Sequence, residues 1–171
     1  MKAISSEELK TILENHRHWL AEDCDGWEAM CANLSYASLN DANLSDADLR
    51  DAKLKGADLS RANLSCANLR GASLNYTDLS YASLNDANLS DADLRGAKLR
   101  CADLSYARLS DADLRCSDLS IANLNNADLR GASLRGAKLR CAKLRCARLS
   151  DADLSKADLS SADLSYASLN D

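Results

Sequence analysis

The apolar positions of this chain follow a period of five. From Leu34 to Leu169 a leucine stands at every fifth position without interruption, which makes 28 leucines. An alanine stands two residues before the leucine in 26 of these units, and Thr77 and Ser117 replace it in the other two. The remaining three positions are mostly Asp, Asn, Ser, Arg, Lys or Gly. The pattern is therefore a small and a large apolar residue, two apart, separated by polar residues.

Neither a helix nor a flat strand can bury this pattern. In a helix each residue turns by about 100°, so leucines five apart are turned by about 140° and form no stripe. In a strand successive side chains alternate between the two faces, so leucines five apart fall on opposite sides. The period of five therefore excludes both elements as the carrier of the core.

A chain that turns a corner within every unit can bury the pattern. An alanine and a leucine two apart point the same way in an extended segment. If a corner follows each pair, all pairs face one interior and the polar residues face outward. Repeated corners make coils, whose backbones pair at a spacing of about 4.8 Å. The absence of proline agrees with this pairing, because every coil must donate hydrogen bonds to its neighbour. The pattern predicts an all-β solenoid.

The repeated phrases also indicate a family. The units ADLS, ANLS, ADLR and AKLR resemble the A(D/N)LXX signature of the pentapeptide-repeat family, over residues 32–171. The resemblance implies a right-handed quadrilateral parallel β-helix with four units in each coil. The 28 units would then make about seven coils, or about 34 Å at the spacing between paired strands. The leucines that line one side of this core would be Leu34, Leu54, Leu74, Leu94, Leu114, Leu134 and Leu154.

The chain divides into an N-terminal helical cap with its connecting loop, residues 1–30, and a β-helix, residues 31–171. The stretch SSEELKTILENHRHWL reads as a helix that begins with a capping box, in which Ser5 and Glu8 each bind the other's backbone amide. Apolar residues at helical spacing, among them Ile12 and Trp19, predict a face that covers the first coil. Trp27 falls in an inward position of a degenerate leading unit. A solenoid needs such a cover over its terminal core.

In the predicted rod, one face of the last coil has no neighbouring coil to pair with. The repeat runs in register up to YASLND, so the pattern predicts an open backbone edge with exposed Leu164 and Leu169. Open edges are templates for association. We expect an end-to-end homodimer through this coil, and the alternative is a coil that frays.

No motif in the sequence indicates catalysis, a metal or a cofactor. The two histidines, His16 and His18, are two apart on the predicted helix and point to different sides, so we expect no shared metal. Five outward cysteines have no CxxC spacing, and only Cys141 and Cys146 lie on neighbouring corners. Paired aspartates such as those in DADLR recur throughout the repeat and mark no single site. We therefore expect a protein that is not an enzyme.

Charge is distributed unevenly along the predicted rod. The net charge is −5, which argues against general nucleic-acid binding. Residues 95–148 nevertheless carry twelve Lys and Arg against five Asp, and acidic segments flank this basic belt. The belt permits local contact with an anion or with nucleic acid.

Three arginines of the belt fall on one face of a four-sided coil. Arg95, Arg115 and Arg135 are twenty residues apart and would stack in successive coils. Asp93 and Asp113 lie beside them and could neutralise part of the stack. Unpaired arginines would repel one another, and an anion would relieve the repulsion. The alternatives are therefore an anion-contact stack and a solvated surface of mixed charge.

These observations predict a rigid, non-enzymatic scaffold that binds an unidentified protein partner through its polar outer faces. No apolar run is long enough to span a membrane and no secretory signal opens the chain, so we expect a cytoplasmic protein with reduced thiols. The family resemblance implies an alternative function, a DNA mimic that binds DNA gyrase or topoisomerase IV. The chain differs from such mimics in its basic belt and in having no interrupted unit.

Overall fold

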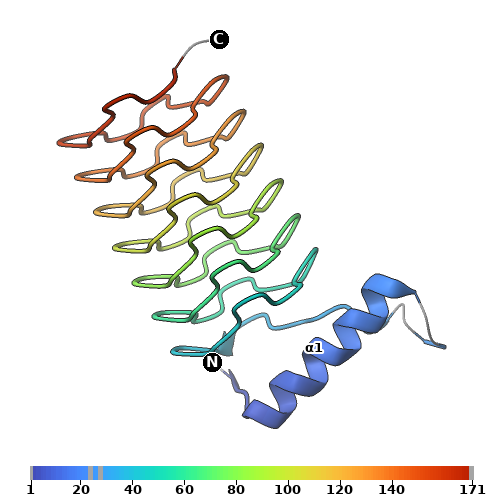
Figure 1. Cartoon of the computed structure of the whole chain (residues 1–171). Coiled ribbons are helices and arrows are strands. Elements are labelled where there is room, and N and C mark those ends of the chain that lie inside the picture. Colours follow the sequence, from blue (N-terminus) through green and yellow to red (C-terminus); the bar gives the residue numbers. More distant parts are fainter. Residues whose placement is uncertain (1, 23–24, 27–28, 170–171) are drawn as a thin grey trace.

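The computed structural model describes residues 2–22, 25–26 and 29–169, and its main body is a stack of coils (Figure 1). The named elements are β1 (Lys2–Ala3), α1 (Ser6–Ala21) and β2 (Ala37–Ser38). Helix α1 lies against the N-terminal end of the stack, and the opposite end carries the C-terminal residues. The rest of the described chain winds along the axis of the rod.

The coils take twenty residues each. Between described residues, 24 parallel bridges join positions twenty apart, from Asn33 with Lys53 to Arg148 with Ser168. Each bridge involves a single residue of each coil, and β1 and β2 are two residues long. Longer strands do not form because a corner follows after every five residues. The coil of twenty residues accommodates four units and hence four sides.

Each corner is a four-residue turn. The amide of the next alanine donates to the carbonyl of the preceding leucine, as from Ala37 to Leu34 at 3.1 Å. The second central residue has a φ of 56–69° at every fifth position from 36 to 166. A positive φ at this position is the signature of a type II turn. Asp, Tyr, Cys and Gly occupy most of these corners, and Ile121 is a β-branched exception.

The leucines and alanines fill the interior. Leu34, Leu54, Leu74, Leu94, Leu114 and Leu134 have 0 % exposure, whereas Leu154, in the last coil, is partly buried. Thr77 and Ser117 are also buried. Their hydroxyls donate to the carbonyls of Leu54 at 2.9 Å and Leu114 at 2.7 Å, so neither leaves an unsatisfied polar group in the core.

Helix α1 begins with the predicted capping box. The Ser5 hydroxyl accepts from the Glu8 amide at 3.2 Å, and the Glu8 carboxylate accepts from the Ser5 amide at 2.8 Å. Leu9, Ile12 and Leu13 of the helix pack against the core of the solenoid. The helix therefore turns its apolar face toward the first coils and its charged face toward solvent.

A buried histidine connects the helix to the first coil. His16 has no exposed surface, and its Nδ1 accepts a hydrogen bond of 3.1 Å from the Ala32 amide. The Trp19 ring stacks on the His16 ring with centroids 5.3 Å apart. Trp27, which the sequence places in the leading unit, lies outside the described residues.

The N-terminal strand was not expected from the sequence. Strand β1 pairs in parallel with β2, with Lys2 opposite Ala37 and Ala3 opposite Ser38. The Lys2 amide donates to the Tyr36 carbonyl at 3.1 Å. The first residues thus extend the stack of paired backbones before the chain enters α1.

The last coil is more exposed than the others. Leu164 is partly buried and Leu169 is 53 % exposed. Within the described residues, the amides of Leu154, Leu159 and Leu164 donate to no backbone carbonyl. In the preceding coils the equivalent amides bond to the carbonyl nineteen residues later. No helix among the described residues has the length and apolar character needed to cross a membrane.

Candidate interaction surface

The polar residue before each leucine holds the corner that follows it. The carboxylate of Asp58 accepts from the Ser60 amide at 3.0 Å, and the amide oxygen of Asn63 accepts from the Ser65 amide at 3.1 Å. This short local bond explains why Asp and Asn recur at this position, since both side chains readily bind backbone two residues on. The outward surface is thus ordered by the same residues that give it its charge.

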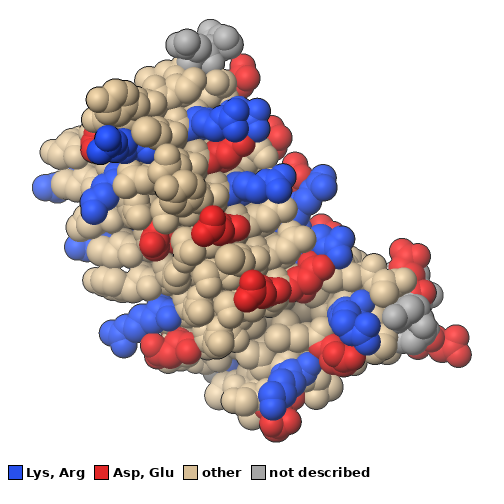
Figure 2. All heavy atoms as spheres, viewed as in Figure 1, with Lys and Arg blue, Asp and Glu red and all other residues tan. Residues whose placement is uncertain are grey.

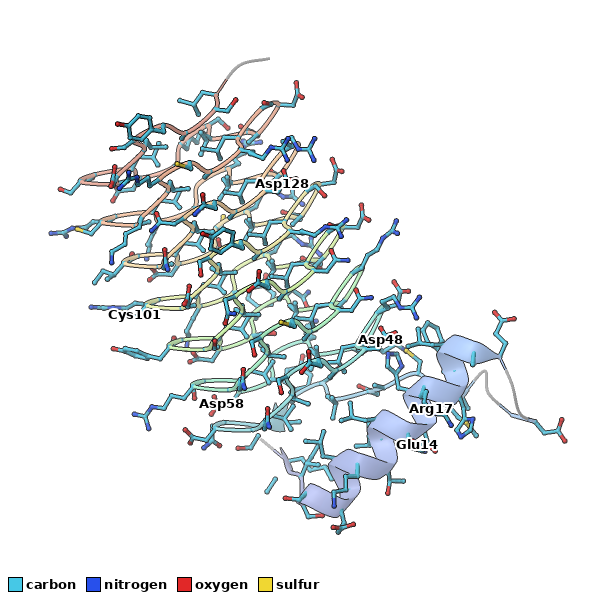
Figure 3. The ribbon with its side chains drawn as sticks, viewed as in Figure 1. Glu14, Arg17, Asp48, Asp58, Cys101 and Asp128 are labelled. Atoms are coloured by element: carbon cyan, nitrogen blue, oxygen red, sulfur yellow. The ribbon has the colours of Figure 1, made fainter. Side chains whose placement is uncertain are left out.

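In Asp-Leu-Arg sequences, the arginine side chain folds back onto the aspartate that precedes the leucine. In Arg95 the Nε and Nη2 donate to the two carboxylate oxygens of Asp93 at 2.8 and 2.7 Å. Figure 3 labels Asp48 and Asp128, the acidic members of the first and last of these pairs along the rod. All four Asp-Leu-Arg sequences of the chain form this two-pronged ion pair: Asp48–Arg50, Asp93–Arg95, Asp113–Arg115 and Asp128–Arg130.

The predicted arginine stack therefore divides into two parts. Arg95 and Arg115 are held by their own aspartates, and Arg95 also lies 3.6 Å from Asp113. Arg135 follows Ser133 in place of an aspartate, and it forms no ion pair within 4.0 Å in the described part of the chain. Only the third member of the stack keeps its charge uncompensated at short range.

The ion pairs also lower the pKa values of the aspartates. The hydrogen bonds from the Arg95 side chain lower the pKa of Asp93, against the opposing effect of burial, and Arg115 does the same for Asp113. The neighbouring arginine of the stack lowers each pKa further. These carboxylates are therefore ionised at neutral pH and act as fixed counter-charges for the first two arginines.

The most basic part of the surface is a single coil. Residues 129–150 contain seven Lys and Arg and no Asp or Glu. One coil takes twenty residues, so this basic collar, residues 130–148, surrounds the rod. The coils on either side each carry four aspartates, at 111, 113, 118 and 128 and at 151, 153, 158 and 163. The collar thus lies between acidic neighbours along the axis.

Contacts between coils moderate the charge of the collar. Arg148 lies 3.8 Å from Asp128 of the preceding coil. Hydrogen bonds from Ser160 lower the pKa of Asp158, and Arg140 of the collar lowers it further. Acidic and basic side chains alternate along the rod on the face shown in Figure 2. The belt predicted from the sequence lies within a surface of mixed charge, and seven of its twelve cations, five of them in the collar, form no ion pair within 4.0 Å among the described residues.

The described residues contain no group of three or more His, Cys, Asp or Glu arranged to hold a metal. His16 is buried against the first coil, whereas His18 lies 3.6 Å from Glu14 on the helix. Cys66, Cys116, Cys141 and Cys146 are exposed corner residues. The two histidine side chains therefore lie in different surroundings.

Tyrosines add apolar contact surface at the corners. Five of them are 56–81 % exposed: Tyr36, Tyr76, Tyr81, Tyr106 and Tyr166. The Arg145 guanidinium lies 5.5 Å from the centre of the Tyr166 ring, within the range of a cation–π contact. Rigid exposed aromatic rings beside arginines are features of protein interfaces.

Comparisons with solved structures return proteins built from the same repeat. HetL, a pentapeptide repeat protein involved in heterocyst differentiation regulation from the cyanobacterium Nostoc sp. strain PCC 7120, is 34% identical, with 81% of this chain and 77% of HetL covered and a TM-score of 0.37. Rfr23 from the cyanobacterium Cyanothece 51142 is 26% identical over 92% of this chain and 98% of Rfr23, with a TM-score of 0.44. No curated protein matches the sequence.

A third structure shows the fold. A trypsin-treated variant of QnrB1, a plasmid-mediated fluoroquinolone resistance protein, is 24% identical over 80% of this chain and 73% of QnrB1, with a TM-score of 0.50. Pentapeptide-repeat proteins form right-handed quadrilateral β-helices, in agreement with the coil of twenty residues. The family model for pentapeptide repeats matches residues 30–65, 62–100, 77–115, 102–140 and 142–171. With its repeats matched along the whole solenoid, the chain belongs to the pentapeptide-repeat family.

Proposed function

We propose that this protein is a non-enzymatic scaffold that binds a protein partner through its polar outer faces. Pentapeptide-repeat proteins are typically structural or interaction scaffolds. The observation that supports the proposal most is the division of the chain into a uniform interior and a varied exterior. Almost every inward position is Ala or Leu, whereas charged, aromatic and thiol side chains stand in outward columns.

The columns suit recognition of a large partner. Side chains twenty residues apart lie in neighbouring coils, about 4.8 Å from one another. A solenoid of this kind offers an extended and rigid surface, so little conformational entropy is lost on binding. A cytoplasmic location for this activity stays a prediction from the sequence.

The experiment uses the full chain as bait in cytosol of the source organism, together with two surface variants. One variant replaces three aspartates of a single corner column, Asp91, Asp111 and Asp151, by Asn. The other replaces Arg140, Lys143 and Arg145 of the basic collar by Gln. All six side chains are exposed, so we expect both variants to retain the thermal melting of the wild type.

A protein that is retained by the wild type and lost from one variant only supports the proposal and identifies the face that binds. Rebinding of that protein, purified, must show the same loss. Capture that is equal on the wild type and on both variants, or no capture above a bait-free resin, would contradict binding through the charged faces.

We further propose end-to-end self-association through residues 152–169. The unpartnered amides of Leu154, Leu159 and Leu164 are spaced as in a paired coil, and Leu169 is exposed beside them. A second copy can supply both backbone partners and apolar cover. Light scattering at micromolar concentration should show a dimer, and Leu164→Lys should convert it to a monomer. A wild type that is strictly monomeric would refute this.

A DNA mimic that binds gyrase or topoisomerase IV is the second candidate. Asp51, Asp91, Asp111 and Asp151 stand in one corner column, and such a line of acid could imitate phosphates. The basic collar interrupts this resemblance. Inhibition of gyrase supercoiling that disappears when the column is changed to Asn would support the mimic. Absence of inhibition at about tens of micromolar protein, well above a micromolar Kd, would dismiss it.

A further inference from the structure

One corner column of the solenoid alternates large and small residues. It contains Tyr36, Gly56, Tyr76, Gly96, Cys116, Gly136 and Lys156, each two positions after a leucine of the same side. A Cβ built on Gly56 would lie 2.7 Å from the Tyr36 ring, and one on Gly96 would lie 2.8 Å from the Tyr76 ring. Each of these two tyrosine rings therefore occupies the space beside the glycine of the next coil that a side chain would need.

The third pair in the column breaks this rule. At Gly136 the nearest atom to a built Cβ is the Cys116 sulfur at 3.7 Å, an ordinary contact distance. The short cysteine stands where a tyrosine would cover the glycine. No ring therefore covers Gly136, although its amide donates to the Ser155 carbonyl at 2.9 Å.

A groove of about 440 Å³ lies at this place. Tyr76 lies at one end and Lys156 at the other, and Gly136 lines the floor between them. Arg95, Arg115 and Arg135 line the groove as well. It therefore combines an aromatic ring, a glycine that no ring covers and four cations from successive coils.

The cations differ in their availability. Arg95 and Arg115 are held by Asp93 and Asp113. Arg135 and Lys156 form no ion pair within 4.0 Å among the residues that the structure describes. Arg135 acts electrostatically on Asp153, whose carboxylate accepts from the Ser155 amide at 2.9 Å, and it lines a second hollow together with Asp111, Asp113 and Asp153. The end of the groove therefore carries two cations without a direct counter-ion.

We propose that Arg135 and Lys156, beside the space that Cys116 leaves over Gly136, bind the dianionic phosphate group of a small molecule. A guanidinium binds two phosphate oxygens in a fork, and an ammonium adds a compact charge beside it. A single carboxylate would neutralise only one of the two cations, whereas a phosphate dianion neutralises both. The Gly136 amide is bonded to the Ser155 carbonyl, so the glycine contributes space for the phosphate, which a side chain or a covering ring would fill, and the two cations contribute the binding.

The groove also indicates how large the ligand can be. Tyr76 and Gly136 are three coils apart, or about 14 Å at the spacing of paired strands. This length accommodates a phosphate group joined to a planar ring that stacks on Tyr76. Free phosphate and a nucleotide share the same phosphate chemistry at Arg135 and Lys156, and they differ in their use of the tyrosine.

The test measures binding to the full chain by calorimetry at constant ionic strength, with inorganic phosphate and with metal-free adenosine diphosphate as probes. Arg135→Gln removes one cation and should weaken binding of both probes by about tenfold or more, as expected for a lost charge-assisted hydrogen bond. Arg140→Gln is the matched control, since it removes an exposed arginine from the next side of the same coil. It should change affinity by less than about twofold.

A second pair of variants alters the groove and keeps every cation. Cys116→Tyr should lay a ring over Gly136, as Tyr36 does over Gly56, and should abolish binding. Cys116→Ser keeps the site open and should bind like the wild type. Tyrosine is accepted at this kind of corner elsewhere in the chain, and thermal melting checks the fold of each variant.

Tyr76→Leu distinguishes the two sources of phosphate. Tighter binding of the nucleotide than of phosphate, lost in Tyr76→Leu, supports a ring-bearing ligand, and equal binding of both probes supports free phosphate. The proposal is overturned if Arg140→Gln matches Arg135→Gln, or if Cys116→Tyr binds like the wild type. It is also overturned if neither probe saturates by about 50 mM, far above a millimolar Kd.

Discussion

Replacement of His16 by phenylalanine should destabilise the protein and remove part of its response to acid. The Nδ1 atom of His16 accepts the buried Ala32 amide, so the ring is neutral in the folded state and carries its proton on Nε2. Phenylalanine keeps an aromatic ring for Trp19 but leaves the amide without an acceptor. An unsatisfied buried amide costs about 1–3 kcal/mol. Phenylalanine also removes the buried Nε2–H of His16, which has no hydrogen-bond partner among the described residues, so we expect a net loss near the lower end, about 1 kcal/mol, in the free energy of unfolding near pH 7.5.

The pH dependence follows from the direction of the pKa shift. Burial lowers the pKa of His16, and the Arg50 backbone and the charges of Asp48 and Asp51 offset this only in part. The folded state therefore binds fewer protons than the unfolded state, and stability rises with pH in this window. The contribution is complete above the ordinary value of about 6.5. It decreases as pH falls below that value and is lost once pH has passed through the lowered pKa of the folded state.

The assay is urea unfolding of the wild type, His16→Phe and His18→Gln between pH 7.5 and pH 5. Both tryptophans lie in the first 30 residues, so their fluorescence reports on the N-terminal segment while circular dichroism reports on the coils. The difference between wild type and His16→Phe should shrink on acidification, by no more than about 1.4 kcal/mol per pH unit for one proton. The His18→Gln control should keep the stability of the wild type at each pH of the series. A His16→Phe protein with unchanged stability at pH 7.5, or with the full wild-type response to acid, would refute the reasoning.

Three further predictions concern the solenoid. Ile121→Asn should raise the free energy of unfolding by about 1 kcal/mol, because a β-branched residue is strained at a φ of 64°. Ile121→Val keeps the branch at Cβ and should bring no gain, and the denaturation midpoints of the two variants test this. Leu94→Ala should cost about 3–5 kcal/mol. Leu164→Ala, in the partly exposed last coil, should cost clearly less in dilute, monomeric protein, and its cost should approach that of Leu94→Ala at concentrations where the proposed dimer forms; equal costs in the monomer would contradict the exposure of the last coil. Asp93→Asn should cost at most about 1 kcal/mol at pH 7, since its partner is exposed, and this cost should decrease as the pH falls below 3.8 toward the lowered pKa of Asp93, because the wild-type carboxylate then begins to take up its proton; urea titrations over this pH range test this.

Most of the fold, but not the extent of its strand pairing, could be predicted from the sequence. A leucine every five residues with an alanine two before it excludes other elements, so the solenoid and its buried residues could be read from the pattern. The family resemblance supplied the four sides, which the bridges between positions twenty apart agree with. The pattern did not predict that pairing would be limited to single residues, because that depends on where each corner begins. It also did not predict β1, whose two residues carry no repeat and pair only because the first coil offers an edge.

The surface, like the fold, could be predicted from the sequence only in part. The composition of the basic belt was plain from the sequence, and Asp93 and Asp113 were placed beside the arginine stack. The sequence alone could not say which arginines stay available, because that depends on side-chain geometry and on the coil above and below. The residue two positions before an arginine nevertheless indicates whether that arginine forms an ion pair within its own unit. Arginine in Asp-Leu-Arg forms an ion pair with the aspartate, and arginine in Ser-Leu-Arg at 133–135 does not.

The solenoid, its Ala-Leu interior and the helix that precedes it could all be predicted from the sequence, because they depend on local periodicity and on capping residues close together in the chain. The burial of His16 against Ala32, the covering of glycines by tyrosines of the preceding coil and the groove beside Gly136 became visible only in three dimensions. Each of these results from contacts between residues sixteen or more positions apart. Such contacts depend on the length of the coil and on the direction of each side chain at its corner.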